Sequence, residues 1–260
     1  MPRFAANLTL MFTEVPFLDR FGKAAEAGFE AVEFLFPYDF DRNEIAERLK
    51  HYNLTQALFN MPPGNWAAGE RGMAAIPGRE EEFRKNLQTA RDYALTLKVP
   101  VLHAMAGITR DLDRAACEET FVANMRHAAD TLAGDDITVL IEPLNSRDIP
   151  GYFVAHQMDA VGWVEKIDRP NVAVQLDLYH AQIMDGDLTR LIERMGERIG
   201  HVQIASVPLR NEPDGGETNY PHLYETLHRV GYKGWIGCEY NPRNGTEAGL
   251  GWFQPYRRRS

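Results

Sequence analysis

Four oxygen-bearing side chains occupy equivalent places in four successive short apolar segments of the chain. Each lies at or near the end of its segment, and the four are Glu142, Asp177, Gln203 and Glu239. Three are carboxylic acids and the fourth is an amide, so all of them offer hard oxygen atoms. If the fold brings the four segments side by side, their ends form one acidic cluster.

Clustered carboxylates repel one another, and two physical outcomes relieve that repulsion. Either the pKa values rise until the groups are neutral, or a cation binds among them. Oxygen ligands suit Mg²⁺ and Mn²⁺ better than Zn²⁺, which prefers nitrogen and sulfur. We therefore expect a divalent metal cofactor at this cluster, with Mg²⁺ as the preferred ion and Mn²⁺ and Co²⁺ as alternatives.

The elements that must position these residues follow a regular alternation. Short apolar segments alternate with stretches whose apolar residues recur every three or four positions, which is typical of βαβα folds. The predicted strands are residues 3–8, 30–36, 55–60, 100–105, 138–142, 172–177, 200–205 and 235–240, and a last helix is predicted at 246–253.

Eight such units in 260 residues predict the α/β class and a single (β/α)₈ TIM barrel spanning residues 1–260. A doubly wound sheet is the weaker alternative, because residues 9–13, after the first strand, lack a Gly-rich phosphate-binding turn. Active sites of TIM barrels lie at the carboxyl ends of the strands. The four oxygen-bearing side chains are therefore expected to converge at one side of the barrel mouth.

Residues 61–78 break the alternation, because they contain seven proline and glycine residues. Loops of this length in compact domains are usually functional or disordered. Trp66, Glu70 and Arg71 give this loop a reason to order over a ligand, so we interpret it as a lid with Glu70 and Arg71 as candidate substrate contacts. The alternative is an exposed ion pair on a mobile loop, which contributes little stability.

Charge and cysteine content restrict the partners of the chain. With 28 basic and 37 acidic residues, the net charge of −9 argues against nucleic acid and disfavours a membrane surface. No apolar run reaches the roughly 18 residues of a membrane span, and no secretory signal is recognised. Two cysteines, Cys117 and Cys238, fit a reduced, cytoplasmic setting. A small-molecule partner is expected, and assembly into a homo-oligomer stays open.

Two histidines on the predicted strands need separate interpretation. His201 precedes Gln203 by two positions, so both should face the barrel interior, where His201 can support the metal ligands. His103 is either a core histidine or part of the pocket lining. Cys238 is adjacent to Glu239 and should point to the opposite face as a buried thiol.

Several stretches together resemble the hydroxypyruvate isomerase family, which lies within the xylose-isomerase-like TIM barrels. They extend over essentially the whole chain and are RFAANL (3–8), VEFLFPY (32–38), AAGERG (67–72), PGRE (77–80), IEP (141–143), GHVQIA (200–205) and GCEY (237–240). Loop residues at 201–214, 219–221 and 246–252 resemble the 2-oxo-tetronate isomerase branch most closely.

The resemblance implies an enzyme that moves a carbonyl between adjacent carbons of a short hydroxy-oxo acid, either hydroxypyruvate or a 2-oxo-tetronate. It also implies that Glu142, Asp177, Gln203 and Glu239 hold the metal, and that Glu142 and Glu239 form the proton-transfer pair. The chemistry agrees, because isomerisation through an enediol moves a proton between carbons and builds negative charge on oxygen.

Related sugar epimerases differ at one informative position. They carry a histidine where this chain has Gln203, and their substrate contacts resemble Asp148, His180 and Arg210. For Arg210, a substrate contact is also expected on chemical grounds, because a guanidinium pairs bidentately with a substrate carboxylate. A ketose 3-epimerase and a non-catalytic sugar-acid binding protein stay as alternatives. A DNA-repair endonuclease of the same superfamily would need His-rich metal sites and a basic rim, which the composition disfavours.

Overall fold

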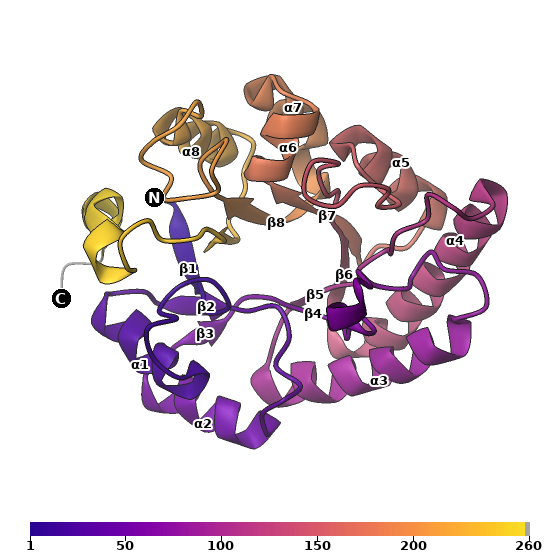
Figure 1. The fold of residues 1–260 in the computed structure, drawn as a ribbon, viewed down its shortest axis with the longest axis horizontal. Helices are drawn as coiled ribbons and strands as arrows, with labels where there is room; N and C mark the ends of the chain where they lie inside the picture. Colours follow the sequence, from indigo (N-terminus) through magenta and orange to yellow (C-terminus); the bar gives the residue numbers. More distant parts are fainter. Residues whose placement is uncertain (258–260) are drawn as a thin grey trace.

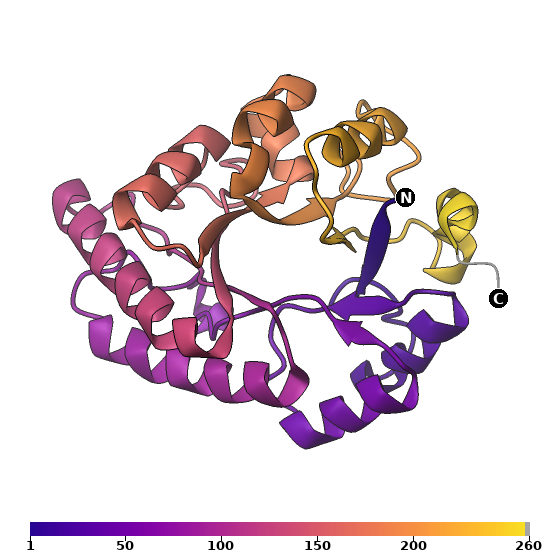
Figure 2. The same cartoon turned by 180° about the vertical axis from the view of Figure 1, so that it is seen from behind.

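The computed structural model describes residues 1–257, and its strands form one curled parallel sheet surrounded by helices (Figures 1 and 2). The strand order is β3-β2-β1-β9-β8-β7-β6-β5-β4, so paired strands are consecutive along the chain except for β1 and β9, the first and the last, which pair with each other. Every pair of strands is parallel, with helices following the strands around the outside. The predicted TIM-barrel fold is confirmed.

The elements have the following bounds. The strands are β1 Arg3–Asn7, β2 Ala31–Glu33, β3 Thr55–Gln56, β4 Phe59–Asn60, β5 Val101–His103, β6 Thr138–Ile141, β7 Val172–Asp177, β8 Ile199–Ile204 and β9 Trp235–Cys238. The α-helices are α1 Phe17–Glu26, α2 Arg42–His51, α3 Glu80–Leu97, α4 Arg114–Leu132, α5 Gln157–Ile167, α6 Leu178–Met184, α7 Leu188–Met195 and α8 Tyr220–Arg229. The 3₁₀ helices are η1 Trp66–Ala68, η2 Ala133–Asp135, η3 Gly196–Arg198 and η4 Glu247–Tyr256.

The third barrel strand differs from its prediction, because the segment predicted at 55–60 is divided into β3 and β4. The first piece pairs with β2 and the second with β5. Between the two pieces, the Ala57 amide donates to the Val32 carbonyl at 2.8 Å. Just after the second piece, the Met61 amide donates to the His103 carbonyl at 2.9 Å. The divided strand therefore changes neighbours along its length and closes the ring.

Two helical predictions also need correction. The last helix is a 3₁₀ helix, η4, because Gly249, Gly251 and Pro255 disfavour a regular α-helix. The chain after β7 forms two helices, α6 and then α7, whereas the βαβα alternation predicts one helical stretch between the strands at 172–177 and 200–205. Asp177 caps α6 by accepting a hydrogen bond from the Tyr179 amide at 2.8 Å, so the strand leads directly into a helix.

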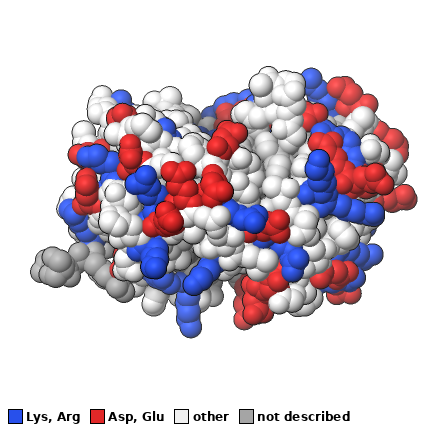
Figure 3. Space-filling view, turned by 90° about the horizontal axis from the view of Figure 1, so that it is seen from below, with Lys and Arg blue, Asp and Glu red and all other residues white. Residues whose placement is uncertain are grey.

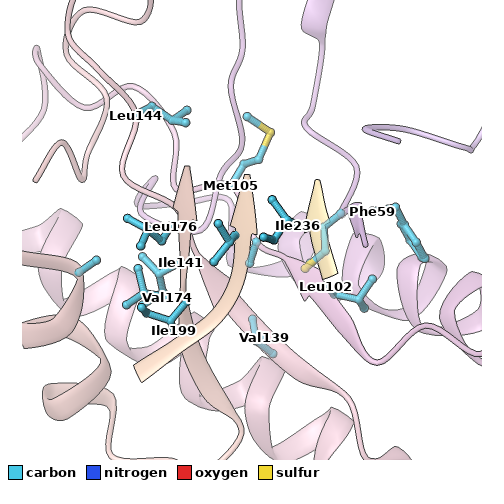
Figure 4. Close-up of a cluster of buried hydrophobic side chains, with 14 of the residues drawn as sticks. Phe59, Leu102, Met105, Val139, Ile141, Leu144, Val174, Leu176, Ile199 and Ile236 are labelled. Carbon is cyan, nitrogen blue, oxygen red and sulfur yellow. The ribbon is translucent and has the colours of Figure 1, made fainter. Parts of the chain in front are cut away.

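The apolar core is organised by the alternation of side chains along each strand. On β7, Val174 and Leu176 alternate with Gln175 and Asp177, and all four are buried. Figure 4 shows the apolar side chains gathered from β6, β7, β8 and neighbouring elements. Because each fully buried Val, Leu or Ile contributes about 1.5–3 kcal/mol, this apolar set fixes the register of the strands and so turns their polar residues to the other face.

Both cysteines are buried and unpaired, as expected, and Cys238 is fully buried beside Glu239. Among residues 1–257, no helix has both the length and the apolar character that a bilayer crossing requires.

The loop at 61–78 contains one short helical turn, η1, as its proline and glycine content predicts. Gly72 anchors this loop to the chain after β5 through a β-bridge with Ala106. Its φ of +98° lies in the left-handed region, and a Cβ there would overlap the Met105 carbonyl. Only glycine satisfies both requirements.

The Gly72→Ala substitution should therefore destabilise the protein more than Gly69→Ala, its matched control. Gly69 has a similar φ of +92°, but nothing lies within 4 Å of a Cβ built there. We expect Gly69→Ala to cost about 1–2 kcal/mol of unfolding free energy from backbone strain alone, and Gly72→Ala to cost at least twice as much. Urea unfolding measures both, and equal losses would contradict the anchoring role of Gly72.

Candidate active site

The ends of four neighbouring strands deliver the predicted oxygen ligands to one region. Asp177 closes β7 and is the register partner of Gln203 on β8, which in turn pairs with Gly237 on β9. Glu142 and Glu239 follow directly after β6 and β9. Each of these side chains is buried, with no more than 8% of any residue exposed. The barrel thus brings the four predicted ligands to the same end of adjacent strands.

A cavity of about 470 Å³ opens over this region, a size suited to a small ligand. Its charged and aromatic lining comes from strand ends, loops, η1 and the first turn of α6 and consists of Trp66, Arg71, Glu142, Asp148, Tyr179, His180, Arg210 and Glu239. Leu10, Leu35, Met105, Leu144 and Ile149 supply most of its apolar wall.

The charge of the cluster is only partly compensated. One Nη2 atom of Arg210 lies 2.8 Å from Glu239 and 3.5 Å from Asp177. Burial lowers the pKa of Arg210, but the surrounding carboxylates outweigh it and raise the value above its ordinary range. Three carboxylates, counting Glu142, against one guanidinium leave a formal excess of two negative charges.

The pKa values of the acids reflect this imbalance. Burial, followed by the charges of Glu239 and Asp177, raises the pKa of Glu142 well above its ordinary value. Burial, with added repulsion from Asp177 and Glu33, raises the pKa of Glu239 to about 8 against the lowering effect of Arg210. Burial also raises the pKa of Asp177. The cluster is therefore poised to accept either protons or a cation.

The residues fit a divalent cation, because its two positive charges match the formal excess of the cluster. Carboxylate oxygens of Glu142 and Asp177 and a ring nitrogen of His180 lie within 4.8 Å of one another. The amide of Gln203 is also oriented, because its Nε2 donates to Glu33 at 2.8 Å while its Oε1 accepts from Gln175 at 2.6 Å. This turns the amide oxygen away from Glu33 and leaves one of its lone pairs for a metal.

The hydrogen-bond network makes His180 a hydrogen-bond donor through Nε2 rather than a metal ligand. Its Nδ1 accepts from the Asn145 backbone amide at 3.1 Å and lies 2.7 Å from the Asn145 side-chain Nδ2. Asp148 fixes the side-chain amide of Asn145. Its carboxylate accepts from Nδ2 at 3.0 Å, and its backbone N–H donates to Oδ1 at 2.8 Å. The proton of the neutral imidazole is therefore on Nε2, 3.5 Å from Asp177. Burial and then Arg210 lower the pKa of His180 well below 6.5.

His103 and Asp148 complete the surroundings. His103 is fully buried, and its Nδ1 lies 3.2 Å from Oε2 of Glu142, so the structure places this histidine against the acidic cluster. Burial lowers the pKa of His103 to about 3, which keeps the ring neutral. Asp148 also accepts from the Tyr179 hydroxyl at 2.9 Å, so its carboxylate is occupied by two side-chain donors from Tyr179 and Asn145.

The two substrate contacts predicted on the 61–78 loop, Glu70 and Arg71, have different surroundings in the structure. Arg71 lines the cavity, whereas Glu70 does not. The Glu70 carboxylate accepts two hydrogen bonds from Arg79, at 2.7 and 3.1 Å, and one from the Asn65 amide at 2.6 Å. Glu70 therefore fastens the loop to the start of α3.

Glu33 is a buried polar residue of the site that sequence reasoning missed. Its carboxylate accepts hydrogen bonds from Asn7 at 3.0 Å and Gln203 at 2.8 Å, and it lies 2.7 Å from Nε2 of His201. A Cβ at Gly237 would overlap this carboxylate, so glycine makes room for it. The sequence signal that could have identified Glu33 is that a carboxylate lies inside the apolar strand predicted at 30–36. His201 faces the interior with Gln203, as expected.

We expect Glu33→Gln to lower the unfolding free energy by about 1–3 kcal/mol, because the new NH₂ group faces donors and leaves buried groups unpaired. Glu81→Gln on the exposed surface of α3 is the control and should stay within about 0.5 kcal/mol. Urea denaturation measures both variants. A Glu33→Gln protein as stable as the control would show that the carboxylate does not hold this network.

Fold and site together define an α/β-barrel enzyme with a buried acidic centre at the carboxyl ends of its strands. The family model for the xylose isomerase-like TIM barrel matches residues 21–256. The chain belongs to the xylose isomerase-like TIM barrel family.

Full-length relatives narrow the class further. A 2-oxo-tetronate isomerase from Cupriavidus necator is 53% identical over 98% of this chain and 99% of its own length. The hydroxypyruvate isomerase of Escherichia coli is 45% identical over 99% of this chain and 100% of its own. The resemblance to the hydroxypyruvate isomerase family is confirmed, and these relatives place the chain among the isomerases.

A solved crystal structure is also closely similar. It is described as an AP endonuclease of family 2 from Brucella melitensis, and it is 69% identical, with a TM-score of 0.99 over 99% of this chain and 100% of that chain. The match extends the barrel assignment to essentially the whole chain.

Proposed function

We propose that the protein is a metal-dependent isomerase that moves the carbonyl between adjacent carbons of a short hydroxy-oxo acid through an enediol. The observation that carries this proposal is the pair Glu142 and Glu239, two buried carboxylates with raised pKa values that line one small cavity. The substrate class follows the names of the relatives, 2-oxo-tetronate first and hydroxypyruvate second.

The reaction needs one group that accepts a proton from carbon and one that returns a proton. For a 2-oxo-tetronate, a carboxylate removes the proton from C3, the C–H electrons form the C2=C3 bond, and the C2 oxygen is protonated. The enediol then loses the proton on the C3 oxygen and gains one at C2, which gives the 3-oxo acid. Hydroxypyruvate gives tartronate semialdehyde by the same steps. Carboxyl groups whose pKa values are raised above the ordinary range suit both transfers.

Other residues of the chain position and stabilise the reacting oxygens. The Nε2–H of His180 is a neutral donor on the cavity wall, held in orientation by Asn145. Such a donor can bond to an oxygen on which negative charge develops. Arg210 supplies a fixed positive charge beside Glu239 and Asp177. Tyr179 and Asp148 complete the wall on this side.

A divalent cation, Mg²⁺ by preference, would be held by Glu142, Asp177, Gln203 and Glu239. When bound it would offset the repulsion among these acids and polarise the substrate oxygens.

The observations favour this isomerase over the endonuclease alternative. Within residues 1–257, one group of three or more His, Cys, Asp or Glu side chains is arranged closely enough to hold a metal ion. On the face shown in Figure 3, Lys and Arg side chains are interspersed with Asp and Glu rather than gathered into a basic surface. Strong binding to DNA phosphates requires such a surface.

The direct test is a proton NMR assay of hydroxypyruvate and both 2-oxo-tetronate enantiomers, with the purified protein and Mg²⁺ or Mn²⁺. We expect conversion of at least one of these acids to its isomer. Inactivity on all three, together with epimerisation of a ketose such as fructose, would replace the proposal by the epimerase alternative.

A further inference from the structure

We propose that Arg71, on the 61–78 loop, binds the carboxylate of the substrate and thereby selects acids over neutral ketoses. The inference rests on the proposed function, since it assigns one end of the same substrate. It identifies which of the two arginines that line the cavity, Arg71 or Arg210, meets the anionic group.

Arg210 is already committed to the protein's own acids. Its Nη2 lies 2.8 Å from Glu239 and 3.5 Å from Asp177. A substrate carboxylate placed on this guanidinium would lie beside two protein carboxylates and would compete with them for the same positive charge. Arg210 therefore orders the acidic cluster, and the carboxylate-binding role expected for it from sequence passes to the other arginine.

Arg71 has the properties that Arg210 lacks. Its guanidinium lies over the Trp66 ring, 3.7 Å from the ring centre, and its Nη1 donates to the Glu70 carbonyl at 2.8 Å and the Trp66 carbonyl at 3.2 Å. Among the residues that the structure describes, no carboxylate forms an ion pair with Arg71. Its charge is held in place but not neutralised, so Nε and Nη2 remain for an anion.

The surrounding loop holds Arg71 in this position. Trp66 packs edge-on against Phe36 with ring centres 5.1 Å apart. Glu70, the preceding residue, is fastened to Arg79 by two hydrogen bonds. An arginine fixed by stacking and by carbonyl acceptors loses little conformational freedom when it binds a planar carboxylate.

Electrostatics give the substrate one orientation in the cavity. At the end lined by Glu142 and Glu239, the guanidinium of Arg210 is already paired with Glu239 at 2.8 Å, whereas Arg71 on the loop side offers one that is unpaired within residues 1–257. The carboxylate of a 2-oxo acid is joined directly to C2, so binding it at Arg71 fixes C2 and directs C3 and its oxygen toward the acidic end. A neutral ketose lacks this contact and would be held less firmly.

Calorimetric titration with glycerate, an acid that has no carbonyl to isomerise, tests the subsite without turnover. Wild-type protein, Arg71→Gln, Arg71→Lys and the control Arg110→Gln are compared in Mg²⁺-containing buffer. Arg110 is exposed, pairs with Asp111 and does not line the cavity. We expect Arg71→Gln to weaken glycerate binding at least 30-fold, Arg71→Lys to weaken it less, and Arg110→Gln to match wild type.

Glyceramide, the uncharged amide of the same acid, separates carboxylate binding from general damage to the loop. Its affinity should be weak and equal in all four proteins. Equal losses for glycerate and glyceramide in Arg71→Gln would overturn the inference, as would wild-type protein that does not bind glycerate. Arg71→Lys keeps the charge and serves as the readout if the glutamine variant does not fold.

Turnover distinguishes this inference from the proposed function. If wild type binds glycerate through Arg71 but isomerises none of the acids, the carboxylate subsite stands and the proposed function fails. If wild type isomerises an acid and Arg71→Gln does so with unchanged KM, the function stands and the inference fails. Both hold if Arg71→Gln raises KM for the acid at least 30-fold with a smaller change in kcat.

Discussion

Replacement of Glu239 by glutamine is expected to lower turnover of the oxo acid by about 10³-fold, within the range that general acid–base catalysis supplies. Glutamine has nearly the same size but can neither accept nor return the proton. Glu142→Gln should have an effect of the same order, because the two carboxylates line the same cavity. Initial rates of the purified variants, followed by NMR, measure the loss.

The same variants should remain folded. Glutamine fills the space of Glu239, and Asp177 stays within 3.5 Å of Arg210, so the guanidinium keeps a carboxylate neighbour. Melting temperatures within a few degrees of wild type are expected. Glu81→Gln, on the exposed face of α3, is the matched control and should keep full activity. A Glu239→Gln protein that isomerises the acid at the parental rate would refute the proton-transfer role.

Removal of divalent cations is expected to abolish turnover, and Mg²⁺ or Mn²⁺ should restore it. The unfolding free energy should also rise on metal binding, because the cation offsets the burial and the mutual repulsion that raise the pKa values of Glu142 and Glu239. A ligand at 100 times its Kd adds about 2.7 kcal/mol to the unfolding free energy, which raises Tm by about 5–10 °C in a chain of this size. Thermal denaturation of chelated and Mg²⁺-loaded protein measures the shift.

A pair of variants locates the effect at the cluster. Asp177→Asn removes a predicted ligand and should lose most of the Mg²⁺-induced shift, whereas Asp111→Asn, on the surface beside Arg110, should keep it. Full activity after chelation, with no metal found by elemental analysis, would exclude the metal dependence.

Much of the fold and the position of the acidic cluster could be predicted from sequence, because both follow from short-range patterns. The period-two alternation on the predicted strands places Asp177 and Gln203 on the polar face, and the strand count predicts the barrel. Once a barrel is predicted, its topology brings residues from four strands together. The proline and glycine content of residues 61–78 likewise predicts an irregular loop.

The contacts that assign roles within the site could not be predicted in this way. The Glu33–Gln203 hydrogen bond joins residues 170 positions apart, and the Arg210–Glu239 pair depends on side-chain rotamers. The tautomer of His180 is set by Asn145, a loop residue 35 positions away. The division of the third strand is a consequence of ring closure rather than of its own six residues, so no local pattern indicates it.

The central claim is that groups in this cavity remove a proton from one carbon of an oxo acid and return a solvent-exchanged proton to the adjacent carbon. Isomerisation in D₂O with Mg²⁺, followed by proton NMR, tests it most directly. We predict that the 3-oxo product of a 2-oxo-tetronate carries solvent deuterium at C2, and that Glu239→Gln incorporates none above background. Folded, Mg²⁺-loaded wild-type protein that gives neither conversion nor deuterium incorporation with any of the 2-oxo-tetronates or hydroxypyruvate would contradict the account.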